Sequence, residues 1–166
     1  MTQDERNIAF PQGPFLSAAF LCETVLREAS GVTSAIRIVD RINHGVIGPE
    51  LRTEMEPFEY RLFLYLALKS GSARGPMELI IRMEDPSVTS KPIHTQTINF
   101  EGDDERGSNI IAELRLQLSF QGLHWFDVFL DGVRITRIPL RVVYLPQVRQ
   151  APPGPPGSGE GESEGQ

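Results

Sequence analysis

The sequence is short of the residues on which several classes of protein depend. It has a single cysteine, Cys22, which excludes a disulfide within the chain and a metal site built from cysteines. Its net charge is -6, whereas a surface that binds nucleic acid needs clustered Lys and Arg, so we expect no nucleic-acid partner. The longest apolar stretch, residues 15–26, is interrupted by Glu23 and is shorter than the roughly 20 residues of a membrane-spanning helix. We therefore expect no membrane segment.

The amino-terminal residues also lack the pattern of a secretory signal. Asp4 and Glu5 offset Arg6, and no apolar core follows a basic opening. The sequence therefore predicts a cytoplasmic protein.

Catalytic and cofactor-binding motifs are missing as well. The three histidines, His44, His94 and His124, show no close metal-ligand spacing, and no phosphate-binding glycine loop, nucleophile elbow or dinucleotide fingerprint occurs. Cys22 lies within an apolar run, where a buried, inert thiol is the expected state. We therefore predict no catalytic residue, no metal and no cofactor, and a protein that is not an enzyme.

Composition divides the chain into three parts. Residues 1–14 are polar and end in Pro and Gly, which predicts a flexible arm. Residues 146–166 are rich in Pro, Gly and Glu and hold almost no apolar groups, so they cannot offset the entropy of ordering and are expected to form a disordered, solubilising tail. Residues 15–145 hold nearly all the apolar residues and form the predicted domain.

The domain shows the two-residue period of β-strands. Apolar residues alternate with polar ones over residues 58–68, 77–83 and 110–120, and Gly-rich turns between such runs predict hairpins. With two runs at 15–26 and 33–42 and a weaker one at 93–100, the count is about eight strands. The predicted fold is an all-β, antiparallel β-sandwich, with a barrel as the alternative. Residues 43–57 have no clear pattern and are interpreted as a long connection that hides a short element or serves as a functional loop.

The last hairpin contains one polar residue on an apolar face. If the turns at Gln121-Gly122 and Asp131-Gly132 are both two-residue loops, Asp127 faces the core opposite Thr136. A buried carboxylate must be paired or hydrogen-bonded, and it is a candidate functional group. Pairing with Thr136 and a nearby arginine, or a bulge that turns the side chain outward, is the favoured interpretation over catalysis.

The opposite face of the same hairpin is apolar where a solvent-facing surface should be polar. This face predicts either an internal cover or a binding surface for a protein partner or a second copy. It is formed by Phe126, Val128, Leu130, Val133 and Ile135.

One acidic cluster, Glu101 to Glu105, is an alternative candidate site. Acidic loops on β-sandwiches can bind calcium, but this one lacks the alternating ligand spacing of a dedicated calcium loop, so a solvated run of charge is favoured.

Two parts of the sequence carry a resemblance to known proteins. These are the segment Phe20-Leu21-Cys22-Glu23, continued at Ala35-Ile36-Arg37-Ile38-Val39-Asp40, and the closing pattern F-D-V-x-L-D-G-x-x-x-x-R-I-P-L-R-V that begins at Phe126. The chain resembles a family of small bacterial proteins known only as a domain of unknown function. The resemblance covers the folded part, implies a small β-sandwich and supplies no catalytic residues.

These observations favour an uncharacterised, non-enzymatic binding or assembly module of a bacterial cytoplasm. Its expected docking surface is the outer apolar face of the carboxy-terminal hairpin. The alternative is an enzyme or a metal-dependent binder centred on Asp127 or on the acidic loop 101–105.

Overall fold

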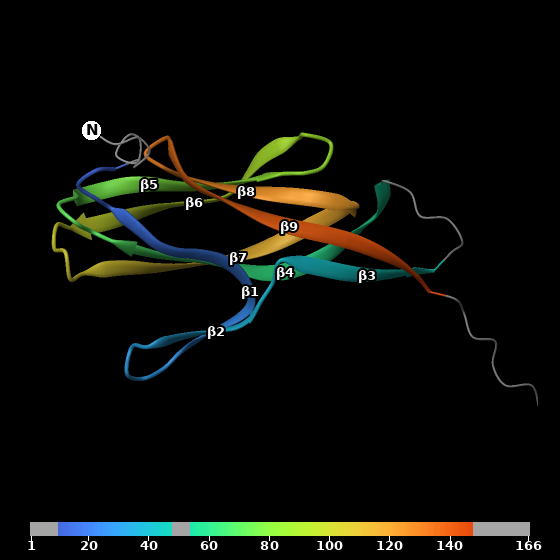
Figure 1. Ribbon diagram of the computed structural model, residues 1–166, viewed down its shortest axis with the longest axis horizontal. Coiled ribbons are helices and arrows are strands. Elements are labelled where there is room, and N and C mark those ends of the chain that lie inside the picture. The colour runs from blue at the N-terminus through green and yellow to red at the C-terminus, as the bar shows by residue number, and fades with distance from the viewer. Residues whose placement is uncertain (1–9, 48–53, 148–166) are drawn as a thin grey trace, which may run out of the picture.

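The computed structural model describes residues 10–47 and 54–147, which form nine strands in two sheets. In chain order, the strands are β1 (Phe15–Arg27), β2 (Thr33–Ile38), β3 (Arg41–Ile47), β4 (Glu54–Lys69), β5 (Arg74–Glu84), β6 (Ser90–Glu101), β7 (Gly107–Phe120), β8 (Gly122–Leu130) and β9 (Val133–Gln147). One sheet has the order β2-β1-β4-β7 and the other β3-β9-β8-β5-β6 (Figure 1). The predicted all-β sandwich is confirmed, with nine strands in place of about eight.

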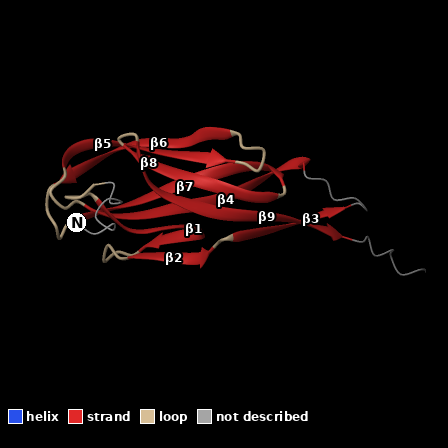
Figure 2. Ribbon diagram, turned by 45° about the horizontal axis from the view of Figure 1, so that its top comes forward, coloured by secondary structure: helices blue, strands red, loops and turns tan. Residues whose placement is uncertain are grey.

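Strands and loops make up the whole of the described chain (Figure 2). Within residues 10–47 and 54–147, no helix has the length and apolarity needed to cross a membrane.

The core lies between the two sheets, and the alternating residues of the long strands form it. Leu62, Leu64, Leu66 and Leu68 of β4 are fully buried, as the two-residue period predicts. The alternation of β7 is confirmed in the same way, because Ile110, Ala112, Leu114, Leu116 and Leu118 are all buried. Burial of apolar surface by these side chains is the main source of stability.

Two predicted strand pairings are wrong. The Gly-rich segment 70–76, between the predicted runs 58–68 and 77–83, does not close a hairpin: β4 pairs with β1 and β7, whereas β5 pairs with β6 and β8 in the other sheet. Gln121-Gly122 likewise carries the chain from β7 in one sheet to β8 in the other.

The predicted runs 15–26 and 33–42 do pair as a hairpin, but the second run is interrupted. β1 and β2 pair antiparallel up to Ile38, after which the chain crosses to the other sheet and continues as β3. Arg37 has a φ of 56°, and the Val39 amide donates to the Leu21 carbonyl at 2.9 Å, so the backbone turns at this point. β3 then pairs in parallel with β9, and these strands lie side by side at one end of the molecule (Figure 1).

The residues 43–57, predicted as a connection, contain the end of β3 and the start of β4, while residues 48–53 lie outside the described part. The predicted arm is described from residue 10 onward. There Phe10 packs against the core, and the Ser72 amide donates to the Gln12 carbonyl at 2.8 Å. Of the predicted tail, residues 146 and 147 end β9, and residues 148–166 lie outside the described part.

The turn at Asp131-Gly132 is confirmed as a two-residue hairpin. Leu130 pairs with Val133, and the turn residues have φ angles of 44° and 77°, which are the positive values of a type I′ turn. Gly132 takes this conformation at no steric cost. The Asp131 side chain also accepts a hydrogen bond from the Glu78 amide at 2.7 Å, which joins the turn to β5.

A bulge in β9 overturns the predicted orientation of β8. Phe129 lies opposite Arg134 as expected, but Val128 lies opposite Thr136, so Ile135 is an extra residue in the ladder. This one-residue shift reverses which side chains of β8 face the core. Asp127 therefore lies opposite Arg137, and its predicted partner Thr136 does not face it.

Candidate functional site

Most of the predicted docking surface on the last hairpin is buried. Phe126, Val128 and Leu130 are 0% exposed and lie in the core between the sheets. Of the other two predicted residues, Val133 is exposed and Ile135 is half-buried against the core. The prediction is wrong because the bulge at Ile135 shifts β8 against β9 by one position and so turns these side chains inward.

Asp127 is buried, as its position suggested, but it lies on the outer face of the five-stranded sheet. Two arginines of β9 cover it: Arg134 Nη1 and Arg137 Nε both contact its Oδ1 atom at 3.3 Å. The Arg137 guanidinium also contacts Glu84 Oε1 at 2.7 Å and lies 4.6 Å from the centre of the Trp125 ring. Of the favoured interpretation, the pairing with a nearby arginine and the bulge that turns the side chain outward are confirmed, whereas the pairing with Thr136 is wrong. Because its Oδ1 atom already accepts two charge-assisted contacts, Asp127 is suited to fixing β9 on β8 rather than to accepting a proton from a substrate.

A second pair of arginines lies on the same outer face. Arg41 of β3 lies directly opposite Arg141 of β9, which lies opposite Leu123 of β8, so these residues form a row across three strands. Arg41 and Arg141 are exposed, and within residues 10–47 and 54–147 neither makes an ion pair. Like charges at directly opposed positions of a sheet are destabilising. Exposed guanidinium groups on neighbouring strands can bind an anion together.

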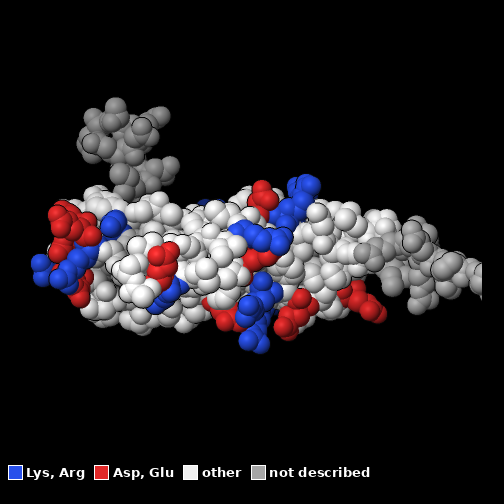
Figure 3. Space-filling view, turned by 90° about the horizontal axis from the view of Figure 1, so that it is seen from below, with Lys and Arg blue, Asp and Glu red and all other residues white. Residues whose placement is uncertain are grey.

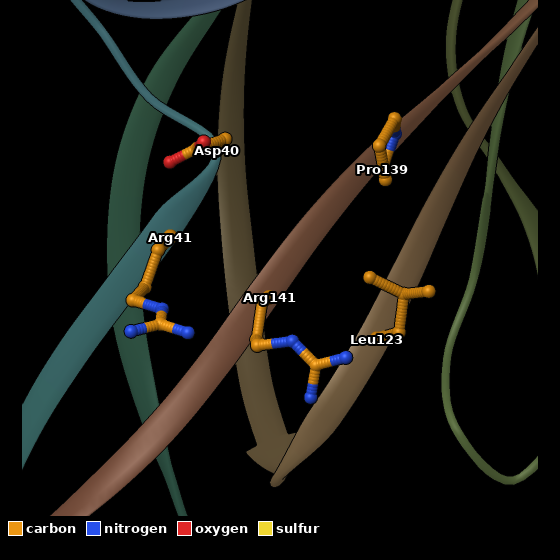
Figure 4. Close-up of a pocket in the computed structure, with 5 residues that line it drawn as sticks. All are labelled: Asp40, Arg41, Leu123, Pro139 and Arg141. Carbon is orange, nitrogen blue, oxygen red and sulfur yellow. The ribbon is translucent and has the colours of Figure 1, made fainter.

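The two arginines line an open depression of about 450 Å³ together with Asp40, Leu123 and Pro139, which we call the arginine groove (Figure 4). The Arg141 side chain extends from β9 toward Leu123, and the Arg41 side chain runs along β3 on the other side of β9 (Figure 4). The Arg141 amide donates to the Asp40 carbonyl at 2.9 Å, which fixes the start of β3 against β9. The groove therefore presents two guanidinium groups and the acidic residue Asp40 beside an apolar floor.

The inner side of β3 holds this edge strand in place. Ile42 is buried in the core, and the His44 ring stacks on Phe58, with the ring centres 3.7 Å apart. Because alternate residues face opposite ways, anchoring Ile42 and His44 inward leaves Arg41 pointing outward. The rigid part of the sandwich thus positions the arginine.

The acidic loop predicted as an alternative site is closed on itself. Arg106 pairs with Glu101 and, at 3.5 Å, with Asp103, and the Asp103 side chain accepts the Glu105 amide at 2.9 Å. In the described ranges, no group of three His, Cys, Asp or Glu residues is arranged to hold a metal ion. Cys22 is fully buried, and this burial raises the pKa of its thiol.

His124 is the other buried polar residue of β8. It is 1% exposed, faces the core, and its Nδ1 atom has no hydrogen-bond partner among the described residues. Burial lowers the pKa of His124, and the nearby Gly122 carbonyl and Asp85 carboxylate oppose this effect without reversing it.

We predict that His124 makes the fold sensitive to mild acid. Because its pKa is lower in the folded chain than in the unfolded chain, the unfolded state binds more protons once the pH falls below about 6.5. Above that pH, His124 should make no pH-dependent contribution to the free energy of unfolding. Below it, the free energy of unfolding should decrease until the pH reaches the pKa of His124 in the folded chain. Urea melts at a series of pH values, compared with His124→Leu, measure this contribution. An equal decrease in both proteins would contradict the prediction.

The fold and the closing hairpin can now be compared with known proteins. Residues 17–143 match a family of unknown function, DUF6941. The chain belongs to this family. DUF6941 thus spans the sandwich from β1 to β9 and includes both the Asp127 cluster and the arginine groove. The expected membership in a domain of unknown function is confirmed at this level.

Other comparisons add little to the DUF6941 assignment. No curated protein matches the chain. Among solved structures, the chain is similar to a Pseudomonas fluorescens alkylpurine DNA glycosylase, AlkC, bound to DNA containing an abasic site analog. The identity is 12% and the TM-score 0.41, over 75% of this chain and 30% of the glycosylase chain. The chain thus spans less than a third of that protein's length.

The arginine groove could not be predicted from local sequence patterns. Alternation along β9 places Arg137, Pro139 and Arg141 on one face, but Arg41 is joined to them only by the parallel pairing of β3 with β9. This pairing joins segments about 100 residues apart, which no local pattern reveals.

Proposed function

We propose that this member of DUF6941 is a non-enzymatic binding module that captures an acidic segment of a partner protein in the arginine groove. The observation that carries the proposal is the row formed by Arg41, Arg141 and Leu123 across three strands. Guanidinium groups bind carboxylates through paired, charge-assisted hydrogen bonds. Two of them on neighbouring strands fit two carboxylates on one side of an extended peptide.

The apolar floor supports a peptide in preference to a free anion. Leu123 and Pro139 line the groove, and Trp125 lies opposite Pro139 on β8. A small anion uses none of these groups, whereas a peptide places its apolar side chains on them. Aromatic and arginine side chains together are typical of residues that contribute most to protein binding.

The charge distribution also favours a short acidic segment over nucleic acid. The chain has a net charge of -6, and positive and negative side chains lie next to one another in small groups on the face seen in Figure 3. A polyanion would meet repulsion beyond the groove, because phosphate binding depends on many clustered positive charges. The two arginines of the groove are enough to bind the few carboxylates of a short acidic segment.

A titration with a labelled peptide tests this function. The probe carries three glutamates that alternate with glycine, and its counterpart carries glutamine at the same positions. We expect the glutamate peptide to bind at low salt and the double variant Arg41→Gln/Arg141→Gln to weaken binding by about tenfold or more. The control variant, Arg27→Gln/Arg74→Gln, removes the same charge from exposed residues of β1 and β5 and should bind as the wild type does.

Several outcomes would overturn the proposal. Equal loss of binding in the two double variants would show a general effect of charge. Equal binding of the glutamine peptide would exclude carboxylate recognition. Binding of a labelled single-stranded oligonucleotide that Arg41→Gln/Arg141→Gln abolishes, without binding of the peptide, would show that the groove serves nucleic acid.

A stability measurement tests whether Arg41 and Arg141 serve binding or hold the sheet together. Arg41→Gln/Arg141→Gln removes repulsion between directly opposed like charges, so we expect the free energy of unfolding to stay the same or rise by less than about 1 kcal/mol. Denaturant melts of the same variant provide the value. A clear loss of stability would indicate that the arginines hold the sheet together.

The proposed setting is a bacterial cytoplasm. Support comes from the resemblance of the closing hairpin to small bacterial proteins and from the single, buried cysteine.

Self-association also stays a prediction: exposed apolar side chains gather on the β1–β2 hairpin, where Leu26, Ile36 and Ile38 are 49%, 41% and 67% exposed.

A further inference from the structure

Three glutamates of the same chain have the chemistry that the arginine groove is proposed to bind. Glu160, Glu162 and Glu164 alternate with Gly161 and Ser163 after the end of β9. Alternate residues of an extended chain point to the same side and lie roughly 7 Å apart. In that conformation the three carboxylates form one row, as the proposed acidic ligand requires.

The length of the connecting segment lets this row reach the groove. Arg141 and Gln147 are six residues apart on β9, which is roughly 20 Å along the strand. Glu160 follows Gln147 by 13 residues, and a flexible chain of that length has a root-mean-square extension of roughly 20 Å. Even if the prolines in this segment extend it, its reach of roughly 40 Å exceeds the distance required. An intramolecular contact is most favoured when the extension of the connecting chain matches the span.

We propose that Glu160, Glu162 and Glu164 occupy the arginine groove of their own chain and compete there with an acidic partner. The inference rests on the proposed function, because it names the first occupant of the same site. The contact places carboxylates beside Arg41 and Arg141 and so relieves the repulsion between these arginines.

The physical consequence is a threshold for partner binding. A tethered segment acts at an effective concentration of the order of millimolar, so a weakly binding tail is displaced only by a partner with higher affinity. Segments with a single carboxylate are then excluded, whereas a partner that also contacts Leu123 and Pro139 displaces the tail. The contact is weakened by salt, because its charges are exposed to solvent.

The test uses the full chain and a variant in which the three residues are changed, Glu160→Gln/Glu162→Gln/Glu164→Gln. The first readout is the NMR resonance of the side-chain Nε–H group of Arg41 and of Arg141. We expect both resonances to differ between the wild type and this variant, and the difference to disappear at high salt. Since the contact is within one chain, the difference should not change on dilution. The control variant changes three exposed glutamates of the sandwich, Glu54, Glu56 and Glu105, to glutamine.

The second readout is the affinity for the alternating-glutamate peptide, which we expect to rise by about two- to tenfold in the tail variant and not in the control. Unchanged Arg41 and Arg141 resonances, with unchanged peptide affinity, would overturn the tail contact and leave the proposed function standing. A difference that vanishes on dilution would assign the contact to a second copy and overturn the intramolecular proposal. If neither protein binds the peptide but the arginine resonances shift, the tail contact holds and the partner proposal fails.

Discussion

Phe126→Ala should lower the free energy of unfolding by about 3–5 kcal/mol. Phe126 is fully buried between the sheets, so truncating its ring removes apolar contacts and leaves a cavity that the neighbouring strands fill only in part. A domain of this size has a total stability of about 5–15 kcal/mol, and the variant should therefore be marginal at room temperature. Phe126→Asp places an unpaired charge in the core and should prevent folding. Urea melts followed by circular dichroism measure the loss.

Phe129 is the matched control for this prediction. It belongs to the same strand and the same residue type, but it lies on the outer face and is half-buried. Phe129→Ala should cost less than about 2 kcal/mol, because less apolar surface is buried there. A larger loss for Phe129→Ala than for Phe126→Ala would mean that Phe129 faces the core, which contradicts the strand register with a bulge at Ile135.

Asp127→Ala should lower the free energy of unfolding by about 2 kcal/mol. The Asp127 side chain is 10% exposed, and its removal leaves Arg134 and Arg137 without their shared counter-charge. These arginines are 54% and 34% exposed, so water compensates part of the loss and the cost stays below that of breaking a fully buried pair. Asp104→Asn, on an exposed loop residue, should change stability by less than about 0.5 kcal/mol.

A double-mutant cycle identifies the partner. Asp127→Ala combined with Arg137→Gln should cost less than the sum of the two single changes, because each removes the same contact. Additive losses would mean that Asp127 is stabilised by Arg134, its other ion-pair partner, or by a further group. They would also reopen the alternative in which Asp127 serves a ligand.

The sequence predicts the layers of this fold well, because burial on one face dictates alternation. Leu62 to Leu68 and Ile110 to Leu118 face the core as their two-residue period requires, and the turn at Asp131-Gly132 has the predicted form. These features depend only on residues close in the chain.

Pairing of strands was less predictable. A Gly-rich connection such as residues 70–73 suits a hairpin and a crossing between sheets equally well, so β4 and β5 were wrongly assigned as partners. Whether the chain forms a hairpin or crosses to the other sheet is determined by how the two sheets pack their apolar faces together. That depends on the whole chain.

One extra residue in β9 explains why the predicted docking surface is wrong. The bulge at Ile135 shifts β8 against β9 by one position, which moves Phe126 into the core and Asp127 to the outer face. No turn residue marks this bulge in the sequence. The predicted pairing of Asp127 with an arginine is still confirmed, because Arg134 and Arg137 contact it on the outer face.

The arginine groove depends on contacts that are distant in sequence. Arg41 and Arg141 meet because β3 pairs in parallel with β9. A parallel neighbour can come from far along the chain, and nothing in residues 41–47 specifies which strand it joins. The groove is therefore recognisable only from the three-dimensional arrangement.

Mapping the contact surface by NMR tests the proposed function most directly. The isotope-labelled full chain is titrated with the alternating-glutamate peptide, and changes in backbone amide resonances are followed along the sequence. The account predicts that the changes gather at residues 40–43, 123–125 and 139–142, which surround the arginine groove. Changes confined to the β1–β2 hairpin, or to the acidic loop 101–105, would contradict it.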